Sequence, residues 1–131
     1  MGRVPLSAWP PRNELVLVTF ITTWCFPCLA ELPVLQTLHE KYASKGLRVV
    51  LVGIDREGRR VLEPLAAQYN FPFPLVVADQ ELASGQSLWG NVGPLPTRVL
   101  FGRDGEVLLV ANGSGVSPQE WLARVGKEVE R

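Results

Sequence analysis

Cysteine, histidine and methionine are scarce in this sequence, which holds two cysteines, one histidine and one methionine among 131 residues. The two cysteines, Cys25 and Cys28, lie three positions apart, too close to cross-link distant parts of the chain. A structural zinc site normally takes four cysteine or histidine ligands. His39 follows Cys28 by 39 − 28 = 11 positions on one expected helix, about 16 Å along its axis. We therefore expect no metal site.

Runs of like charge and long apolar runs are also missing. Thirteen basic and thirteen acidic residues cancel, so no electrostatic argument favours nucleic acid or an anionic membrane as a partner. The longest apolar run, Leu15 to Ile21, is far shorter than the ~20 residues that span a bilayer. No small-residue cleavage site follows it, so we do not expect this run to be the core of an export signal.

The composition that remains is that of one globular domain, with 47% hydrophobic and 20% charged residues. Residues 1–13 contain three prolines and no periodicity, which predicts an extended N-terminal lead-in. We expect residues 14–131 to form a single domain and the protein to be a monomer.

Hydrophobic patterns predict an α/β fold. Glu14 to Ile21 and Leu47 to Ile54 are apolar on both faces, as in strands buried inside a sheet. Between them, apolar residues recur at three- and four-residue steps from Cys25 to Lys45, and Gly46 can end this helix. A helix between two buried strands implies a parallel, right-handed crossover.

The rest of the chain adds further elements. A helix around Val61 to Tyr69 has Pro64 near its first turn, where proline is tolerated. Asp-Gly between two apolar runs predicts an antiparallel hairpin, and a capping box at Ser117 opens the last helix. The elements are a strand at Pro74–Ala78, a short helix at Gln80–Trp89, hairpin strands at Thr97–Phe101 and Glu106–Ala111, and a helix from Ser117 toward Arg131. We expect a three-layer α/β/α sandwich with a mixed central sheet and this antiparallel C-terminal hairpin.

The Cys25-x-x-Cys28 motif stands where the first strand meets the first helix. There, unpaired backbone N–H groups and the helix dipole should lower the pKa of the Cys25 thiol and favour its thiolate. Cys28, one turn further in, should be more buried and should resolve a mixed disulfide. The pair thus predicts a redox-active disulfide, with Cys25 as nucleophile, Cys28 as resolving thiol and no separate cofactor.

Glu31 lies one helical turn beyond Cys28. Two interpretations stay open for it, a solvated helix residue or a proton acceptor for Cys28 when the mixed disulfide is resolved. Phe26 and Pro27, between the cysteines, carry no charge and add nothing to the thiolate beyond the helix terminus.

Two separated motifs carry a resemblance to a known family. The first is Trp24-Cys25-Phe26-Pro27-Cys28 with Glu31 and Pro33 after it, and the second is Leu95-Pro96-Thr97 leading into a strand and the Gly102–Glu106 turn. Together they resemble the thioredoxin fold, and most closely the bacterial TlpA/ResA-like thiol-disulfide oxidoreductases. The similarity covers about Leu15 to Val129.

The resemblance implies a cis peptide bond before Pro96, facing the dithiol. In that arrangement Leu95 would pair with an extended substrate segment, with Trp24, Phe26 and Pro27 supplying contact around Cys25. Two departures stand out. Thr19 occupies the position of a buried aspartate or asparagine in relatives, which makes Glu31 the better proton acceptor. Arg98 lies in an apolar strand, either flanking the sheet or near an acidic substrate group.

The resemblance also implies an activity, partners and a location. We expect an enzyme that reduces or exchanges protein disulfides, with a cysteine-containing protein substrate and an upstream thiol reductant. It implies a periplasmic or membrane-anchored location, with the export signal absent or trimmed, and the alternative is the cytoplasm. Two other functions stay open, a peroxiredoxin-like peroxidase, favoured by Thr22 before Cys25, and a non-catalytic binding module with the same fold.

Overall fold

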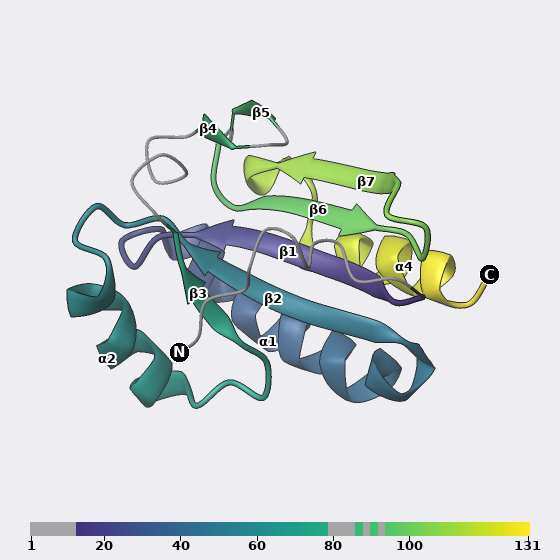
Figure 1. The fold of residues 1–131 in the computed structure, drawn as a ribbon, viewed down its shortest axis with the longest axis horizontal. Coiled ribbons are helices and arrows are strands. Elements are labelled where there is room, and N and C mark those ends of the chain that lie inside the picture. The colour runs from purple at the N-terminus through teal and green to yellow at the C-terminus, as the bar shows by residue number, and fades with distance from the viewer. Residues whose placement is uncertain (1–12, 79–85, 88–89, 92–93) are drawn as a thin grey trace.

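The computed structural model describes residues 13–78, 86–87, 90–91 and 94–131, and the expected lead-in therefore lies almost entirely outside the described residues. Its larger sheet has five strands in the order β3-β2-β1-β6-β7 (Figure 1). The strands are β1 (Leu15–Ile21), β2 (Leu47–Gly53), β3 (Leu75–Val77), β6 (Thr97–Phe101) and β7 (Val107–Asn112). The helices are α1 (Phe26–Tyr42), α2 (Arg59–Tyr69) and α4 (Pro118–Val129), with short 3-10 turns η2 (Ala43–Lys45) and η3 (Gly113–Gly115).

Strand β1 is the centre of the sheet. All seven of its residues are buried, as their apolar character on both faces predicts. It pairs in parallel with β2, from Leu15 opposite Leu47 to Ile21 opposite Gly53, and antiparallel with β6. The carboxyl ends of β1 and β2 therefore meet at one edge of the sheet, where the dithiol follows β1.

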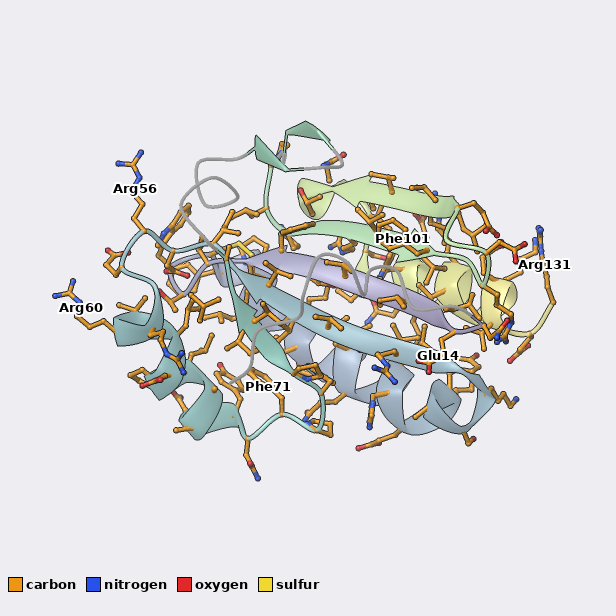
Figure 2. The ribbon with its side chains drawn as sticks, viewed as in Figure 1. Glu14, Arg56, Arg60, Phe71, Phe101 and Arg131 are labelled. Carbon is orange, nitrogen blue, oxygen red and sulfur yellow. A yellow bond between two sulfur atoms is a disulfide. The ribbon has the colours of Figure 1, made fainter. Side chains whose placement is uncertain are left out.

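The described helices all cover one face of this sheet, so the part of the chain that the structure describes shows two layers of the expected three-layer α/β/α sandwich. Leu32 of α1, Leu62 of α2 and Trp121 of α4 belong to the same buried cluster, together with Leu17 of β1. Two successive right-handed crossovers, β1-α1-β2 and β2-α2-β3, place α1 and α2 on that same side. Side chains fill the space between sheet and helices, whereas Arg56, Arg60 and Arg131 point outward (Figure 2).

The opposite face carries a second apolar cluster that includes Val16, Val18 and Phe20 of β1.

Part of the predicted helix at Gln80–Trp89 can be tested, because residues 86–87 and 90–91 are described. Gln86–Ser87 is strand β4 and pairs antiparallel with β5 (Gly90–Asn91), so the helix is wrong there. An apolar pattern interrupted by Gly85 carries too weak a helix signal to decide this. Residues 79–85 and 88–89 lie outside the described part.

Helix boundaries follow local sequence with one correction. Gly46 ends the first helical segment at φ 93°, a left-handed conformation that suits glycine. Ser117 caps α4 by accepting a hydrogen bond from the backbone N–H of Glu120 at 3.1 Å. Helix α2 begins at Arg59, earlier than its apolar residues indicate, so Pro64 lies in its interior and not in its first turn.

The predicted C-terminal hairpin is confirmed. Strands β6 and β7 pair antiparallel, from Thr97 opposite Asn112 to Phe101 opposite Val107. The turn between them closes through a hydrogen bond from Gly102 N–H to the Glu106 carbonyl at 2.7 Å. The fold is thus α/β with a mixed sheet and an antiparallel edge hairpin.

Candidate active site

Cys25 is the N-cap of α1, and its sulfur is bonded to that of Cys28. Its backbone is extended at φ −90° and ψ 102°, as an N-cap residue requires, and Pro27 in the first turn needs no hydrogen-bond partner for its nitrogen. The N–H of Cys28 donates to the Cys25 sulfur at 3.2 Å. An N–H group and a helix N-terminus therefore both face the atom that would carry negative charge in the reduced state.

The two sulfurs differ in access. Cys28 is 0% exposed and Cys25 is 6% exposed, which is the order expected for a resolving and an attacking thiol. Cys25 alone of the two borders an open apolar pocket of about 570 Å³. The pocket is lined by Trp24, Cys25, Phe26, Pro27, Ile54, Pro94 and Leu95. A partner sulfur can reach Cys25 through this pocket.

Trp24 and Phe26 flank the nucleophile and are the two most exposed large apolar side chains reported for the described residues, at 69% and 83%. Neighbouring apolar side chains that are exposed in this way often mark a binding site on a soluble protein. A second pocket of about 260 Å³ shares Trp24, Ile54 and Leu95 with the first and adds the polar side chains of Asp55, Arg56 and Glu57. The Cys25 sulfur thus lies beside an apolar pocket, and a smaller pocket with polar side chains adjoins it.

The peptide bond between Leu95 and Pro96 is cis, as the resemblance implies. Leu95 lines the pocket beside Cys25, while Pro96 is buried and is not among the residues that line it. Thr97 Oγ1 donates to the Pro94 carbonyl at 2.9 Å, and Asn112 Nδ2 donates to Thr97 Oγ1 at 3.1 Å. These bonds hold the segment in place from inside the fold.

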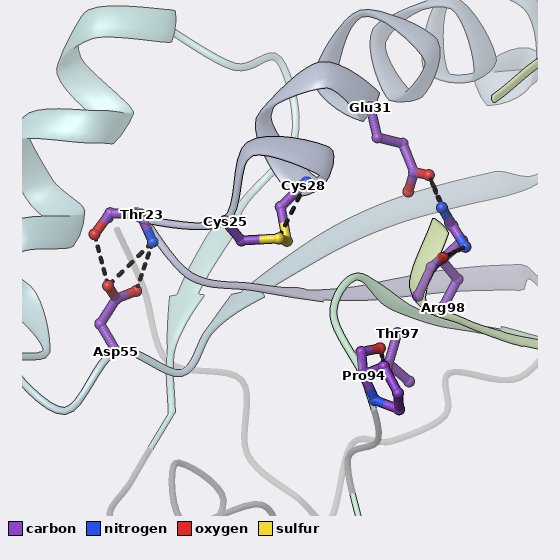
Figure 3. Close-up of a disulfide and its surroundings, with 9 residues drawn as sticks. Thr23, Cys25, Cys28, Glu31, Asp55, Pro94, Thr97 and Arg98 are labelled. Atoms are coloured by element: carbon purple, nitrogen blue, oxygen red, sulfur yellow. Dashed lines mark hydrogen bonds and ion pairs between the residues drawn. A yellow bond between two sulfur atoms is a disulfide. The ribbon is translucent and has the colours of Figure 1, made fainter. Parts of the chain in front are cut away.

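Glu31 and Arg98 form a buried ion pair, with side chains 1% and 3% exposed (Figure 3). Arg98 Nε donates to Glu31 Oε1 at 2.6 Å, and Arg98 Nη2 contacts the same oxygen. The solvated interpretation of Glu31 is therefore wrong. Both interpretations of Arg98 are also wrong, because its side chain points into the fold, toward α1. The role of Glu31 as proton acceptor stays a prediction.

Sequence reasoning missed Asp55, which follows β2 at the edge where the dithiol follows β1. Its carboxylate accepts from the Thr23 N–H at 3.1 and 3.0 Å and from Thr23 Oγ1 at 2.6 Å (Figure 3). Asp55 is 4% exposed. The signal that could have found it is an aspartate directly after a buried strand, at the carboxyl end where functional groups of parallel strands gather.

Two further residues considered in the sequence, His39 and Thr19, are also described. His39 is half-buried on α1 and its ring lies 6.0 Å from that of Phe73, edge to face. Thr19 is fully buried, and its hydroxyl oxygen has no hydrogen-bond partner among the described residues. Within that same part of the chain, no three histidine, cysteine, aspartate or glutamate side chains gather where they could share a metal ion.

Comparison with known families places the chain. The model of the AhpC/TSA family matches residues 1–110, most of its length. The chain belongs to the AhpC/TSA family. Among curated relatives, the thiol-disulfide oxidoreductase ResA of Geobacillus kaustophilus (strain HTA426) is 32% identical over 79% of this chain, and ResA of Bacillus anthracis is 35% identical over 74%. This chain spans only 57% and 54% of those two proteins, a little over half of their length.

Solved structures show that this AhpC/TSA member has a thioredoxin-like fold. A Chlorobium tepidum protein solved as a candidate thiol:disulfide interchange protein DsbE superposes with a TM-score of 0.76 at 28% identity, over 89% of this chain and 81% of the other. StoA from Bacillus subtilis superposes with a TM-score of 0.68 over 88% and 85% of the two chains. At 21% identity, StoA supports the fold alone. No described helix is long and apolar enough to cross a bilayer.

Proposed function

We propose that this chain is a thiol-disulfide oxidoreductase that reduces or exchanges disulfides of protein substrates. One observation carries the proposal, the Cys25–Cys28 disulfide at the N-terminus of α1 beside an apolar pocket that Cys25 alone of the pair borders. The names of the ResA relatives support the same activity.

The exchange proceeds in two steps whose electrons balance. In the reduced protein the Cys25 thiolate attacks one sulfur of a substrate disulfide, forms a mixed disulfide and releases the other substrate sulfur as a thiolate that takes up a proton. Cys28 then loses its proton and attacks the Cys25 sulfur, which releases the second substrate thiolate. The protein dithiol has then given two electrons to the substrate and is left as the Cys25–Cys28 disulfide. An upstream dithiol reductant reduces this disulfide again.

The pocket indicates the kind of substrate segment that fits. Its lining is apolar on both sides of Cys25. Trp24 and Phe26 come from the segment around the start of α1, and Pro94 and Leu95 come from the segment before β6. An extended peptide with an apolar residue beside its cysteine buries that residue here, and its backbone can pair with Leu95. In this proposal Trp24, Phe26, Pro27 and Leu95 form the substrate site, whereas Pro96, expected from sequence to belong to it, is buried and does not line the pocket. The resemblance to TlpA/ResA-like proteins favours a location outside the cytoplasm.

Trapping with Cys28→Ser tests the proposal, because this variant can attack but cannot resolve. We expect it to form a stable mixed disulfide with a cysteine-containing peptide disulfide, seen as an added mass that dithiothreitol removes. Cys25→Ser is the matched control and should trap nothing. Equal trapping by both variants, or none by either, would contradict the proposal.

Two further assays separate the alternatives. The unaltered protein should shorten the lag of insulin precipitation in dithiothreitol, whereas a binding module with this fold would leave the lag unchanged. Hydrogen peroxide consumed by the reduced protein faster than a peptide disulfide is reduced would favour the peroxidase.

A further inference from the structure

Arg98 is a cation in the protein interior, on the side of the sheet that α1 covers. The residue is 2% exposed, and its guanidinium lies 5.6 Å from the centre of the Trp121 ring. An arginine stays charged in a protein, so its burial requires an anionic partner with good hydrogen-bond geometry. Glu31 supplies that partner from α1.

The two carboxylate oxygens of Glu31 differ in their contacts with Arg98. Both contacts of Arg98 are with Oε1. Oε2 is buried and has no hydrogen-bond partner among the described residues. It is turned away from Arg98 (Figure 3). Oε2 therefore has a vacant acceptor position in the interior, and Glu31 lies one helical turn from Cys28.

A third contact keeps the guanidinium from rotating. Arg98 Nη1 donates to the Gly113 carbonyl at 3.1 Å. The N–H of Gly113 in turn donates to the carbonyls of Pro94 and Pro96, each at 2.9 Å. Arg98 is therefore anchored to the segment that also holds Pro94 and Leu95 at the pocket.

We propose that Arg98 is a positioning residue for the second step of thiol exchange, because it holds the Glu31 carboxylate so that Oε2 is free to take the proton of Cys28. Arg98 does not line the pocket beside Cys25, and its hydrogen bonds go to Glu31 and to the Gly113 carbonyl, so in this proposal it acts through Glu31. The inference rests on the proposed exchange function. It adds that Arg98, a residue of β6, affects the rate at which Cys28 resolves the mixed disulfide.

A disulfide of two thionitrobenzoates separates the two steps. The reduced protein releases the first coloured thiolate when Cys25 attacks and the second when Cys28 resolves the mixed disulfide. In Arg98→Met we expect the first phase to be unchanged and the second to slow about tenfold or more, but by less than the roughly 10²–10⁴-fold that complete loss of a general base gives, because Glu31 itself remains. Arg98→Lys, which keeps the charge without the planar fork, should recover part of that loss.

The decisive comparison is the double variant. If Arg98 acts through Glu31, then Arg98→Met slows the second phase in the unaltered protein but not in a Glu31→Gln background. Equal slowing in both backgrounds, or a second phase in Arg98→Met within twofold of the unaltered protein, overturns the inference. If Arg98→Met does not fold, Arg98→Lys takes its place in the same cycle. Failure of the exchange function itself looks different, because the unaltered protein would then show no second phase.

Arg48→Met is the matched control for loss of a cation. Arg48 pairs with Glu14 at 2.9 Å, but its side chain is 55% exposed and lies outside the pocket beside Cys25. We expect both phases of this variant to equal those of the unaltered protein. A slowed second phase in Arg48→Met would show that loss of any cation has the effect and would overturn the assignment to Arg98.

Discussion

Asp55 holds the segment that leads to the nucleophile. The three hydrogen bonds of its carboxylate all come from Thr23, two positions before Cys25. Hydrogen bonds to a charged, buried group contribute more than those between neutral groups, about 1.5–3 kcal/mol each against about 1. Asp55 therefore fixes the backbone from which Trp24 and Cys25 project.

Asp55→Ala should lower the free energy of unfolding by about 2–4 kcal/mol, since it removes the acceptor and leaves the Thr23 N–H in a half-buried place. It should also lower kcat/KM for a peptide disulfide, because the Trp24 and Cys25 segment loses its anchor. Urea denaturation and initial rates measure the two effects. Thr23→Val is the control and should cost less than half as much, because the N–H bonds remain. Equal loss in both variants would contradict the role given to the backbone contact.

The residues that could be predicted from sequence are those whose chemistry is local. Cys25 and Cys28 are three positions apart, so spacing alone brings their sulfurs together. The partner of Asp55 is 32 positions away and that of Arg98 is 67 positions away. Such pairings depend on strand order and register, which a single sequence leaves open. The position of Arg98 opposite Thr19 in adjacent strands is what turns its side chain toward α1.

Packing between elements also depends on one small residue at the end of β2. A Cβ added at Gly53 would lie 2.4 Å from Leu62 Cδ2 and 2.6 Å from Leu62 Cδ1, and Leu62 on α2 is fully buried. Sequence patterns located both elements, since β2 is apolar and α2 has an apolar stripe. They could not give the close contact between them, which follows from how the crossover seats the helix on the sheet.

Gly53→Ala should therefore lower the free energy of unfolding by about 1–3 kcal/mol, because the fully buried Leu62 must shift to make room for the added methyl group. Chemical denaturation monitored by tryptophan fluorescence measures the change. Gly115→Ala is the matched control, since an added Cβ there meets no atom within 4 Å and the backbone is not left-handed. It should stay within about 0.5 kcal/mol of the unaltered protein. A Gly53→Ala protein as stable as this control would show that α2 can shift.

The redox state of the dithiol and the stability of the whole molecule are linked. Closing the short Cys25–Cys28 loop restricts the unfolded chain, which by chain entropy favours the folded oxidised form by about 2 kcal/mol. The helix N-terminus opposes this by stabilising the reduced thiolate, but only by about 0.3–1 kcal/mol. The apolar residues that line the pocket around Cys25 offer no charged partner for that thiolate. The oxidised protein should therefore be the more stable form.

We expect the oxidised protein to exceed the reduced protein by about 1–2 kcal/mol in free energy of unfolding. Since 1.4 kcal/mol corresponds to 30 mV for a two-electron couple, the disulfide should be about 20–40 mV harder to reduce in the folded protein than in the unfolded chain. Denaturant titrations of both forms measure the first quantity, and equilibration with a glutathione series in water and in denaturant measures the second. The difference in unfolding free energy and the difference in reduction potential must agree, because they close one thermodynamic cycle.

The Cys25→Ser/Cys28→Ser double variant is the control for this linkage, and its stability should not change with the redox buffer. A reduced form more stable than the oxidised form would mean that the thiolate gains more from the N-terminus of α1 than a helix end ordinarily supplies. The disulfide would then be easier to reduce in the folded protein than in the unfolded chain, which makes the protein a stronger oxidant. The sign of this stability difference thus shows whether folding makes the dithiol more reducing or more oxidising than it is in the unfolded chain, and the direction of electron flow follows when that potential is compared with the partner's.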